Sequence, residues 1–566
     1  MAAPIKVTPP PASSSSFLSR HRELLGLLLL ASIVFFYKLG SYPLFDLDEP
    51  RYAEAAREML EKGNWITPYF NYELRFDKPV FFYWLIATAY QWFGLSEFSA
   101  RFFSAVTATS SVLMVYAFGK HWISRHFGLL AALILSTCVM FIGIGRMSIT
   151  DMTLTCLMTA TTLCLFMAAH QHLRWWLAAG LMAGLAVLTK GPVGLVVPGT
   201  IFTLYTLLIG DFRRCLINRW LPLALLICVA VALPWYVLAY RQNGDIFLNA
   251  LVLHNVTRYS DVVSGHKQPF YFYALVLLGG FFPWTAYLPA ALHQFVGLSK
   301  THRQQIETKN FRYLVPLFSA VWIAFVFVFF SFGSTKLLTY ILPLFPALAL
   351  LTASGFTPIT QPVNSAKPPA NGKWFTIPAW TLVGLTAIGG LVFTTQMGHL
   401  LPREAAGVQA NGYNVAAVII LLAGFTATAW LIRQKKLYTA ILAQVLSMSL
   451  LVIVAIQGIV PNVSKAAQGV MMDYLQQIGN QPVMLYEIQR PSLTFYGQRK
   501  VPRYVEEQAP DLIQTLKQTL SNHPQSFIIT KSTFIPQLRD LLPPSLQLHI
   551  VEKDRVYSLL SVSQAP

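Results

Sequence analysis

The feature that most constrains this chain is a series of long apolar runs that repeats from Leu24 to Val460. Most runs approach the length of about 20 residues that a helix needs to cross the hydrocarbon core of a bilayer. Of the 566 residues, 55% are hydrophobic and 12% are charged, whereas about a quarter of a soluble domain is charged. Most of the chain is therefore expected to lie in a membrane.

The basic composition and the cysteines exclude several other classes of protein. The net charge is +18, but Lys and Arg lie in loops between apolar runs, where they set membrane orientation, so we expect no nucleic-acid partner. The five cysteines lie in or beside apolar runs without CxxC spacing, which gives no support to a disulfide framework or a zinc ribbon. Residues 1–16 are rich in Pro and Ser, as is typical of disordered segments.

Membrane orientation follows from the basic loops. Arg20 and Arg22 precede the first run, which has no cleavage site after it and is expected to be an uncleaved helix with its N-terminus in the cytoplasm. The stretch 80–93 is short and aromatic. If it lies flat on the membrane, the loop with Lys120 and Arg125 falls inside, and so does every later basic loop.

This choice predicts about thirteen spans and an outer C-terminus. It also predicts one long external loop, 44–101, with two interfacial helices near 49–62 and 79–93. The expected spans are 24–41, 102–119, 127–147, 152–170, 174–189, 192–210, 219–241, 271–290, 313–333, 336–354, 376–396, 413–432 and 437–459.

Three parts of the chain are expected. Residues 1–23 form a cytoplasmic N-terminus, 24–460 a membrane domain, and 461–566 a small α/β domain outside the membrane. The last part shows neither GxGxxG nor a P-loop. Its alternating patterns predict strands at 483–486, 526–530, 548–551 and 556–560, and helices at 511–520 and 535–542.

Charged residues at membrane depth are costly, so their placement is informative. Three clusters fall on the outer face of the predicted topology: Asp48 with Glu49, Asp77 with Lys78, and Arg146 with Asp151. The first two clusters have simpler explanations. The acid pair could only cap the helix that begins near Pro50, and the second cluster could only anchor the chain at the interface. Because all three converge on one face, we favour a functional site, with Glu49 among its catalytic acids and Arg146 among its phosphate-binding cations.

Further cations are expected on the same face: Lys190, Arg258 and Lys336, with Tyr340 beside the last. Acids set among bases suit a lipid-phosphate substrate, because cations hold the phosphate and a carboxylate handles the acceptor or the positive charge that develops on a sugar. His254 and His266 with Asp77 could bind zinc or magnesium, but their spacing fits no common ligand pattern. No cofactor is predicted to be required.

Five motifs resemble those of the bacterial lipid A 4-amino-4-deoxy-L-arabinose transferase family, within the GT-C superfamily that includes the protein O-mannosyltransferases. They are Asp-Glu-Pro-Arg-Tyr (48–52), Asp-Lys-Pro-Val (77–80), Arg-Met-Ser-Ile-Thr-Asp (146–151), Leu-Thr-Lys-Gly-Pro (188–192) and Lys-Leu-Leu-Thr-Tyr-Ile-Leu-Pro (336–343). The resemblance implies a GT-C fold, with Asp48 as the principal catalytic acid and Asp151 as the second. It places Arg51, Tyr52, Lys78 and Tyr340 around a lipid-phosphate pocket.

The resemblance also implies an undecaprenyl-phosphate aminosugar donor, a lipid A phosphate acceptor and a bacterial inner membrane. We expect a monomer that contacts membrane lipids, with the donor phosphate among Lys78, Arg258 and Lys336. One departure is Asp77, where the family is expected to have Glu; the shorter side chain puts a metal ligand there in doubt.

Two alternatives remain. The acceptor could be a hydroxyl of a protein or glycan, in which case Asp48 must act as a general base. A lipid transporter or flippase is disfavoured, because its charges would lie near the bilayer midplane, often in two related halves.

Overall fold

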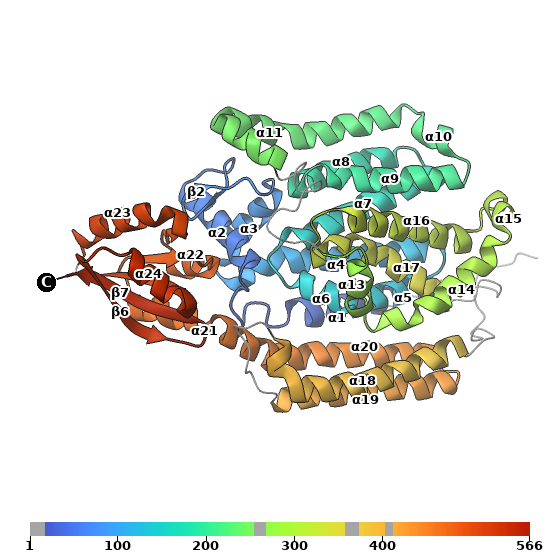
Figure 1. Ribbon diagram of the computed structural model, residues 1–566. Helices are drawn as coiled ribbons and strands as arrows, with labels where there is room; N and C mark the ends of the chain where they lie inside the picture. The colour runs from blue at the N-terminus through green and yellow to red at the C-terminus, as the bar shows by residue number, and fades with distance from the viewer. Residues whose placement is uncertain (1–16, 254–267, 357–372, 402–410, 524, 566) are drawn as a thin grey trace, which may run out of the picture.

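The computed structural model describes residues 17–253, 268–356, 373–401, 411–523 and 525–565. A long bundle of helices carries a small sheet at one end, and a region with helices α2 and α3 lies between the two (Figure 1). The predicted fold class, a helical membrane protein with a small C-terminal α/β domain, is confirmed.

The bundle contains the following elements in chain order: α1 Phe17–Ala31, η1 Ser32–Phe36, α4 Glu97–Trp122, α5 Arg125–Ser136, α6 Val139–Gly145, α7 Thr150–His170, α8 Trp175–Lys190, α9 Val193–Leu208, α10 Phe212–Leu216, α11 Trp220–Val252, α13 Phe272–Gly280, η3 Trp284–Tyr287, α14 Leu288–Ser299, α15 His302–Glu307, α16 Phe311–Phe332, η4 Leu338–Leu344, α17 Phe345–Phe356, α18 Lys373–Leu400, α19 Gly412–Arg433, α20 Leu437–Val454 and η5 Ala455–Ile459.

The lengths and compositions of these helices fit a multi-pass membrane protein. Among the described residues, eight helices are long and apolar enough to cross a bilayer, or up to ten if each of two bent pairs is one span. The pairs are α5 with α6, bent by 69°, and α13 with α14, bent by 104°. Helices α8 and α9 are apolar but have 16 residues each. Each expected span overlaps helical residues, although α4, α11 and α18 run past the apolar segment, because hydropathy does not end a helix.

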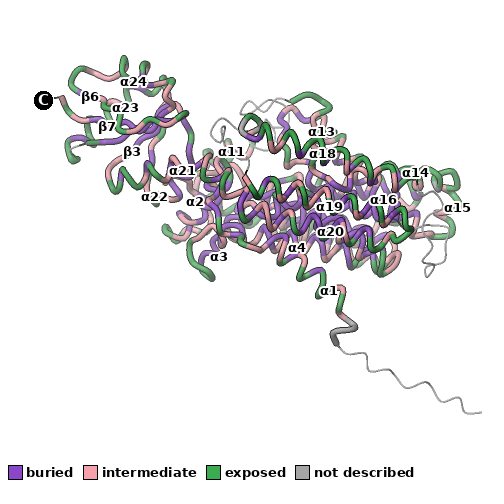
Figure 2. The backbone as a smooth tube through the Cα atoms, turned by 90° about the horizontal axis from the view of Figure 1, so that it is seen from below, coloured by how far each residue is buried: buried purple, intermediate pink, exposed green. Residues whose placement is uncertain are grey.

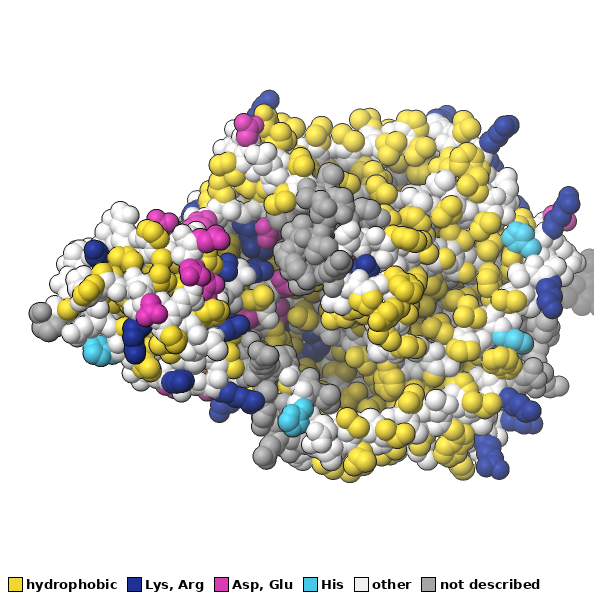
Figure 3. All heavy atoms as spheres, viewed as in Figure 1, with side chains coloured by type: hydrophobic (Ala, Val, Ile, Leu, Met, Phe, Trp, Pro, Cys, Tyr) yellow, Lys and Arg dark blue, Asp and Glu magenta, His cyan; other side chains and the backbone are white. Residues whose placement is uncertain are grey.

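Helix α7 is the centre of the bundle. In its apolar window 89% of residues are buried inside the protein, against 22% in α11 and 28% in α19, which lie at the periphery. Figure 2 shows the buried residues concentrated in the interior of the bundle. Figure 3 shows a largely hydrophobic wall on the bundle, with Lys and Arg gathered at its far end and near the sheet domain. This distribution suits a bilayer around the wall.

The region between bundle and sheet contains α2 Asp48–Glu61, β1 Tyr69–Phe70, β2 Glu73–Leu74 and α3 Phe81–Phe93. Both helices lie where the sequence predicts interfacial helices. The N-cap of α2 is Leu47, with no side-chain cap hydrogen bond, so Asp48 and Glu49 lie in the first turn. The alternative that the acid pair only caps this helix is therefore not what the structure has.

The C-terminal part contains α21 Val460–Ile478, β3 Val483–Tyr486, α22 Pro491–Gly497, β4 Arg503–Tyr504, η6 Glu506–Gln508, α23 Ala509–Leu520, β5 Ser526–Lys531, η7 Ser532–Phe534, α24 Ile535–Leu541, β6 Leu546–Lys553 and β7 Tyr557–Gln564. The strand order is β4-β3-β5-β7-β6, with β3 parallel to β4 and β5 and the remaining pairs antiparallel. Every strand and helix expected after Val460 is present; the elements that were not expected are α21, α22, β4 and the short helices η6 and η7.

Both faces of this sheet are covered by helices. Val483 and Leu485 of β3 pack with α21 and α22, whereas Met484 and Tyr486 pack with α23 and α24. Alternate residues of a strand point to opposite faces, which is why all four are apolar and buried. Helix α21 continues from α20 through η5, so the change of composition at Val460 is not a break in the helix.

Candidate functional site

A cavity of about 300 Å³ lies where α7, α8, α9, α16 and η4 meet. Its polar lining comes from segments far apart in the sequence, and its remaining walls are apolar. The lining residues are Lys78, Asp151, Leu154, Lys190, Pro192, Val193, Val196, Phe329, Phe330, Gly333, Thr335, Thr339, Tyr340 and Pro343. Four of the predicted site residues therefore meet in one place: Lys78, Asp151, Lys190 and Tyr340.

An ion pair between Asp151 and Lys190 forms the polar centre of the cavity. Lys190 Nζ lies 2.6 Å from Asp151 Oδ1, and each side chain is 12% exposed. The same ammonium lies 4.7 Å from the centre of the Tyr340 ring, a cation–π contact. Asp151 lies in the first turn of α7 and Lys190 is the last residue of α8. Gly191 follows with φ +82°, a conformation that glycine adopts readily and that lets the chain turn at the cavity.

Tyr52 of α2 is buried, and both predicted catalytic acids influence its pKa. Burial is the largest cause that raises the pKa of Tyr52 well above its ordinary value, and the neighbouring Tyr83, Asp48 and Asp151 raise it further. The Arg75 guanidinium, 5.8 Å from the centre of the Tyr52 ring, opposes them. Tyr52 therefore keeps its proton and lies within electrostatic reach of both predicted catalytic acids.

Asp48 is the accessible acid of the pair. Its side chain is 67% exposed and lies 3.7 Å from Arg51 Nη1. Nearby, Asp77 lies 2.8 Å from Arg75. Asp48 is not among the residues that line the cavity, and its catalytic role stays a prediction.

Glu49 is buried, with both carboxylate oxygens occupied. Arg101 donates to both, from Nε to Oε1 and from Nη2 to Oε2, at 2.8 Å each. The backbone N–H of Ser148 donates to Oε1 at 2.7 Å, and that of Phe45 donates to Oε2 at 2.9 Å. Both side chains of the ion pair are 0% exposed. This geometry favours a positioning role for Glu49: it joins α2, α4 and the approach to α7.

Two residues predicted to bind phosphate, Arg146 and Lys336, donate hydrogen bonds to backbone carbonyls instead. Arg146 is 3% exposed and donates to the carbonyls of Val34 and Tyr37, at 3.0 and 2.7 Å, near the end of the first helix. Lys336 donates to the Gly333 carbonyl at 2.8 Å, at the edge of the cavity. Of the two, only Lys336 lies close to the cavity lining.

The predicted metal site falls partly outside the described residues. His254, His266 and the predicted phosphate-binding Arg258 lie within 254–267, and Asp77 has an arginine as its ion-pair partner. In the part of the chain that the structure describes, no group of three or more His, Cys, Asp or Glu is arranged to hold a metal ion. The metal site stays a prediction.

The C-terminal domain contacts Asp46, which lies two residues before Asp48. Asp46 accepts hydrogen bonds from the Ser492 backbone N–H at 2.9 Å and from its hydroxyl at 2.6 Å, and Arg490 Nη1 lies 3.5 Å away. Burial raises the pKa of Asp46, while Ser492 and Arg490 oppose the rise. Tyr496 accepts from the Leu44 N–H at 2.8 Å. Helix α22 therefore holds the segment that carries Asp48.

Comparison with known proteins identifies relatives of this chain. Residues 77–238 match the dolichyl-phosphate-mannose-protein mannosyltransferase family. The undecaprenyl phosphate-alpha-4-amino-4-deoxy-L-arabinose arabinosyl transferase of Erwinia tasmaniensis is 32% identical over 331 residues, which cover 57% of this chain and 58% of the relative. The protein of the same name from Pectobacterium carotovorum is 29% identical over 72% of this chain and 71% of its own. This chain is similar in sequence to those aminoarabinose transferases and spans about three fifths of the length of the first of them. The resemblance indicated by the motifs is thus confirmed.

A solved structure has the same fold as this chain. ArnT from Cupriavidus metallidurans in the apo state has a TM-score of 0.76 and 21% identity, and the match covers 96% of this chain and 98% of that chain. ArnT bound to undecaprenyl phosphate matches equally well, with 20% identity. The architecture of this chain, including the C-terminal domain, is therefore that of the solved ArnT structures.

Sequence reasoning missed three residues that hold the loop before Asp48: Arg101, Asp46 and Ser492. Arg101 could have been predicted to have an acidic partner, because it lies within an apolar helix, where a charge needs one. Asp46 and Ser492 are 446 residues apart, and nothing in the local sequence of either pairs them.

Replacing Ser492 by alanine should lower kcat about tenfold and change KM little, because a lost hydrogen bond to a charged group lets Asp48 move from its productive position. Ser492→Thr should restore most of the rate. The measurement is initial transfer rate against donor concentration in detergent or proteoliposomes. Ser532→Ala, which removes a hydroxyl bonded to Ser558 in the same domain, is the matched control and should leave kcat unchanged. A uniform loss in both variants would contradict positioning.

Glu58 of α2 should make stability fall as pH rises. Burial, and next the charge of Glu54, raise its pKa from 4.5 to about 7. Folding favours the protonated form of Glu58. Its contribution to the free energy of unfolding is therefore fully present below pH 4.5 and is lost as the pH rises through about 7, by up to about 3 kcal/mol. Thermal unfolding at pH 5 and pH 8 measures this. Glu58→Gln should remove that part of the pH dependence and Glu507→Gln, at an exposed position, should not. An unchanged dependence in Glu58→Gln would refute the assignment.

Proposed function

We propose that this chain transfers 4-amino-4-deoxy-L-arabinose from undecaprenyl phosphate to a phosphate group of lipid A. The observation that carries the proposal is the cavity in which Lys78 and Lys190 accompany Asp151 at the end of an apolar bundle. Ammonium groups suit a lipid phosphate, and the apolar walls suit the first units of a polyprenyl chain. The names of the relatives supply the sugar and its carrier, and the lipid A acceptor follows from the motif resemblance.

In the proposed reaction, the bond between the anomeric carbon and the donor phosphate oxygen breaks, and undecaprenyl phosphate leaves with the electron pair. Lys78 and Lys190 stabilise the negative charge on that leaving phosphate, and Asp151 holds the Lys190 ammonium in place. Asp48 stabilises the positive charge that develops on the sugar. An oxygen of the acceptor phosphate, already ionised near pH 7, forms the new bond without a base.

The proposed location is a bacterial inner membrane. The N-terminus lies in the cytoplasm, and the loop with α2, α3 and the C-terminal domain lies in the periplasm, because the basic loops of the sequence collect on the opposite side. The chain acts as a monomer in this proposal. A divalent metal at Asp77, His254 and His266 remains a prediction, and no step above depends on it.

The match of residues 77–238 to the protein mannosyltransferase family favours one alternative, a hydroxyl acceptor on a protein or glycan. The donor and the cavity would be the same. Asp48 would then accept the proton of the attacking hydroxyl, as a general base.

A transfer assay separates these possibilities. Purified protein in proteoliposomes receives undecaprenyl-phosphate aminoarabinose and lipid A, and mass spectrometry follows the acceptor. We expect a mass gain of one aminopentose unit that disappears when the donor is omitted. Donor consumption only with a protein or glycan acceptor would overturn the lipid A proposal and support the alternative. Movement of the donor across the bilayer without transfer to any acceptor would favour a transporter.

A further inference from the structure

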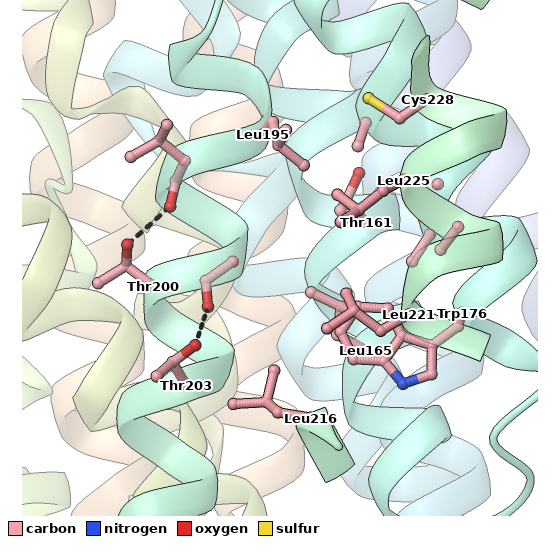
Figure 4. A pocket seen from close by; sticks show the side chains of 16 residues that line it. Thr161, Leu165, Trp176, Leu195, Thr200, Thr203, Leu216, Leu221, Leu225 and Cys228 are labelled. Atoms are coloured by element: carbon pink, nitrogen blue, oxygen red, sulfur yellow. Dashed lines mark hydrogen bonds between the residues drawn. The ribbon is translucent and has the colours of Figure 1, made fainter. Parts of the chain in front are cut away.

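A second cavity, of about 410 Å³, lies between α7, α8, α9 and α11, with α10 at one end (Figure 4). It is distinct from the candidate active site, although Val196 of α9 borders both. Its lining is almost entirely apolar: Thr161, Leu165, Trp176, Ala179, Gly180, Ala183, Leu195, Val196, Gly199, Thr200, Thr203, Leu216, Leu221, Ala224, Leu225 and Cys228. The peripheral helix α11 forms one wall, so the cavity lies next to the surrounding lipid.

The three threonines of the lining do not make it polar. Thr200 and Thr203 donate to the carbonyls of Val196 and Gly199 in their own helix, at 2.8 Å each, as the dashed lines in Figure 4 show. Thr161 donates in the same way to Leu157 at 2.9 Å. A hydroxyl that already donates to its own helix offers a ligand little, so the walls favour a hydrocarbon chain.

One polar atom in the lining lacks a partner. The indole of Trp176 is 6% exposed, and its Nε1–H has no hydrogen-bond acceptor among the described residues. A buried tryptophan N–H usually finds an acceptor. An ester carbonyl at the head of a lipid chain would supply one.

Four arginines lie within or directly before the helices that meet at the Trp176 end of the cavity. Arg174 immediately precedes α8, Arg213 and Arg214 lie on α10, and Arg219 immediately precedes α11; all four are exposed. Leu216 of α10 reaches into the cavity lining. Basic residues between membrane helices, close to an apolar cavity, are typical of sites for anionic lipid head groups.

The arginine end is far from the candidate active site. Trp176 and Lys190 lie 14 residues apart on α8, at opposite ends of that helix, which corresponds to about 21 Å. The head group that these arginines would bind is therefore not the donor phosphate beside Lys78 and Lys190.

We propose that this cavity binds one acyl chain of an anionic glycerophospholipid. An ester carbonyl accepts the hydrogen bond of Trp176, and the head-group phosphate lies among Arg174, Arg213 and Arg219. The bound chain fills the space between α8 and α9 and so stabilises the helix whose other end carries Lys190. The site binds lipid whether or not the chain transfers sugar.

The test measures lipid binding to the full-length protein in detergent. Dioleoylphosphatidylglycerol and dioleoylphosphatidylcholine are titrated separately, and native mass spectrometry and thermal unfolding follow binding. We expect one retained phosphatidylglycerol per chain and at least tenfold weaker binding of phosphatidylcholine. Equal binding of the two lipids, or no retained lipid, would overturn the proposal. One-for-one displacement of phosphatidylglycerol by undecaprenyl phosphate would also overturn it, since the cavity would then hold the donor chain.

Filling the cavity supplies a matched pair of variants. A side chain added at Gly199 meets nothing within 4 Å, so Gly199→Phe should occupy the cavity without disturbing the backbone and should weaken phosphatidylglycerol binding at least tenfold. Gly389→Phe, at an equally open position on the exposed face of α18, should bind as the unaltered protein does. If Gly199→Phe does not fold, the smaller Gly199→Leu replaces it. Unchanged binding in the filled variant contradicts the site.

Substitutions of the arginines give a second test variant with its control. Arg213→Gln with Arg219→Gln should weaken phosphatidylglycerol binding at least fivefold and reduce its dependence on salt, because the phosphate loses two cations. Arg433→Gln, which removes an exposed arginine at the end of α19, is the control and should bind normally. Equal loss in both would mean that only the net charge matters, and the proposed head-group site would be wrong.

Discussion

Asp48→Asn should lower the rate of sugar transfer by about 10²- to 10⁴-fold, the range of a positioned acid or base. Its carboxylate is 67% exposed, near Arg51 at 3.7 Å, and replacing it by an isosteric amide removes the charge without leaving a buried group unpaired. The loss should therefore fall on kcat while thermal unfolding stays unchanged. The assay is the proteoliposome transfer reaction with both acceptor classes.

The size of the loss also separates the two acceptor chemistries. With a phosphate acceptor no proton must be removed, so some transfer should remain in Asp48→Asn; with a hydroxyl acceptor, transfer should be abolished. Glu73→Gln, which removes an exposed carboxylate from the same loop, is the control and should transfer at the normal rate. Full activity in Asp48→Asn would exclude Asp48 from both mechanisms.

Arg101→Met should destabilise the protein by about 3–5 kcal/mol, the cost of leaving one partner of a buried ion pair alone. The Glu49 carboxylate would lose its ion-pair partner in a site that is 0% exposed, with only the backbone N–H groups of Phe45 and Ser148 left as donors. Transfer should be lost as well, because Glu49 fixes the first turn of α2, which carries Asp48. Thermal unfolding in detergent measures the first effect.

Removing both charges should be less harmful than removing one. The double variant with Glu49→Gln and Arg101→Met leaves no unpaired charge, so it should recover a large part of the lost stability relative to Arg101→Met alone. Arg303→Gln breaks an exposed pair with Glu307, whose side chains are 93% and 65% exposed, and should change stability by less than about 1 kcal/mol. If Arg101→Met unfolds at the normal temperature, the pair does not hold the loop.

Local patterns were sufficient for most of the elements. A strand such as Val483–Tyr486 or a helix such as Phe81–Phe93 is encoded by consecutive residues, and apolar length together with the basic loops indicates where the spans lie. The bends within α5–α6 and α13–α14 could not be predicted this way, because the apolar pattern continues through both.

The candidate site was predictable in part. The cost of charge at membrane depth indicated that Lys78, Asp151 and Lys190 belong to one face, and the structure places them around one cavity. The same reasoning could not separate them from Arg146, which is equally charged and equally close to a span end. Its actual partners are the carbonyls of Val34 and Tyr37, about 110 residues earlier in the chain.

By itself, the sequence determined that this chain is a membrane bundle with a small α/β domain. It also indicated which face of the membrane collects the three clusters that contain acids, and which family the chain resembles. These features can be predicted because hydropathy and motif spacing depend only on residues that are neighbours in the sequence. Only the tertiary structure decided that Glu49 is enclosed by Arg101, that Ser492 of the C-terminal domain holds Asp46, and that Asp48 is left exposed. Pairs separated by 52 and 446 residues leave no local signal, because burial and partner choice arise only when distant helices pack together.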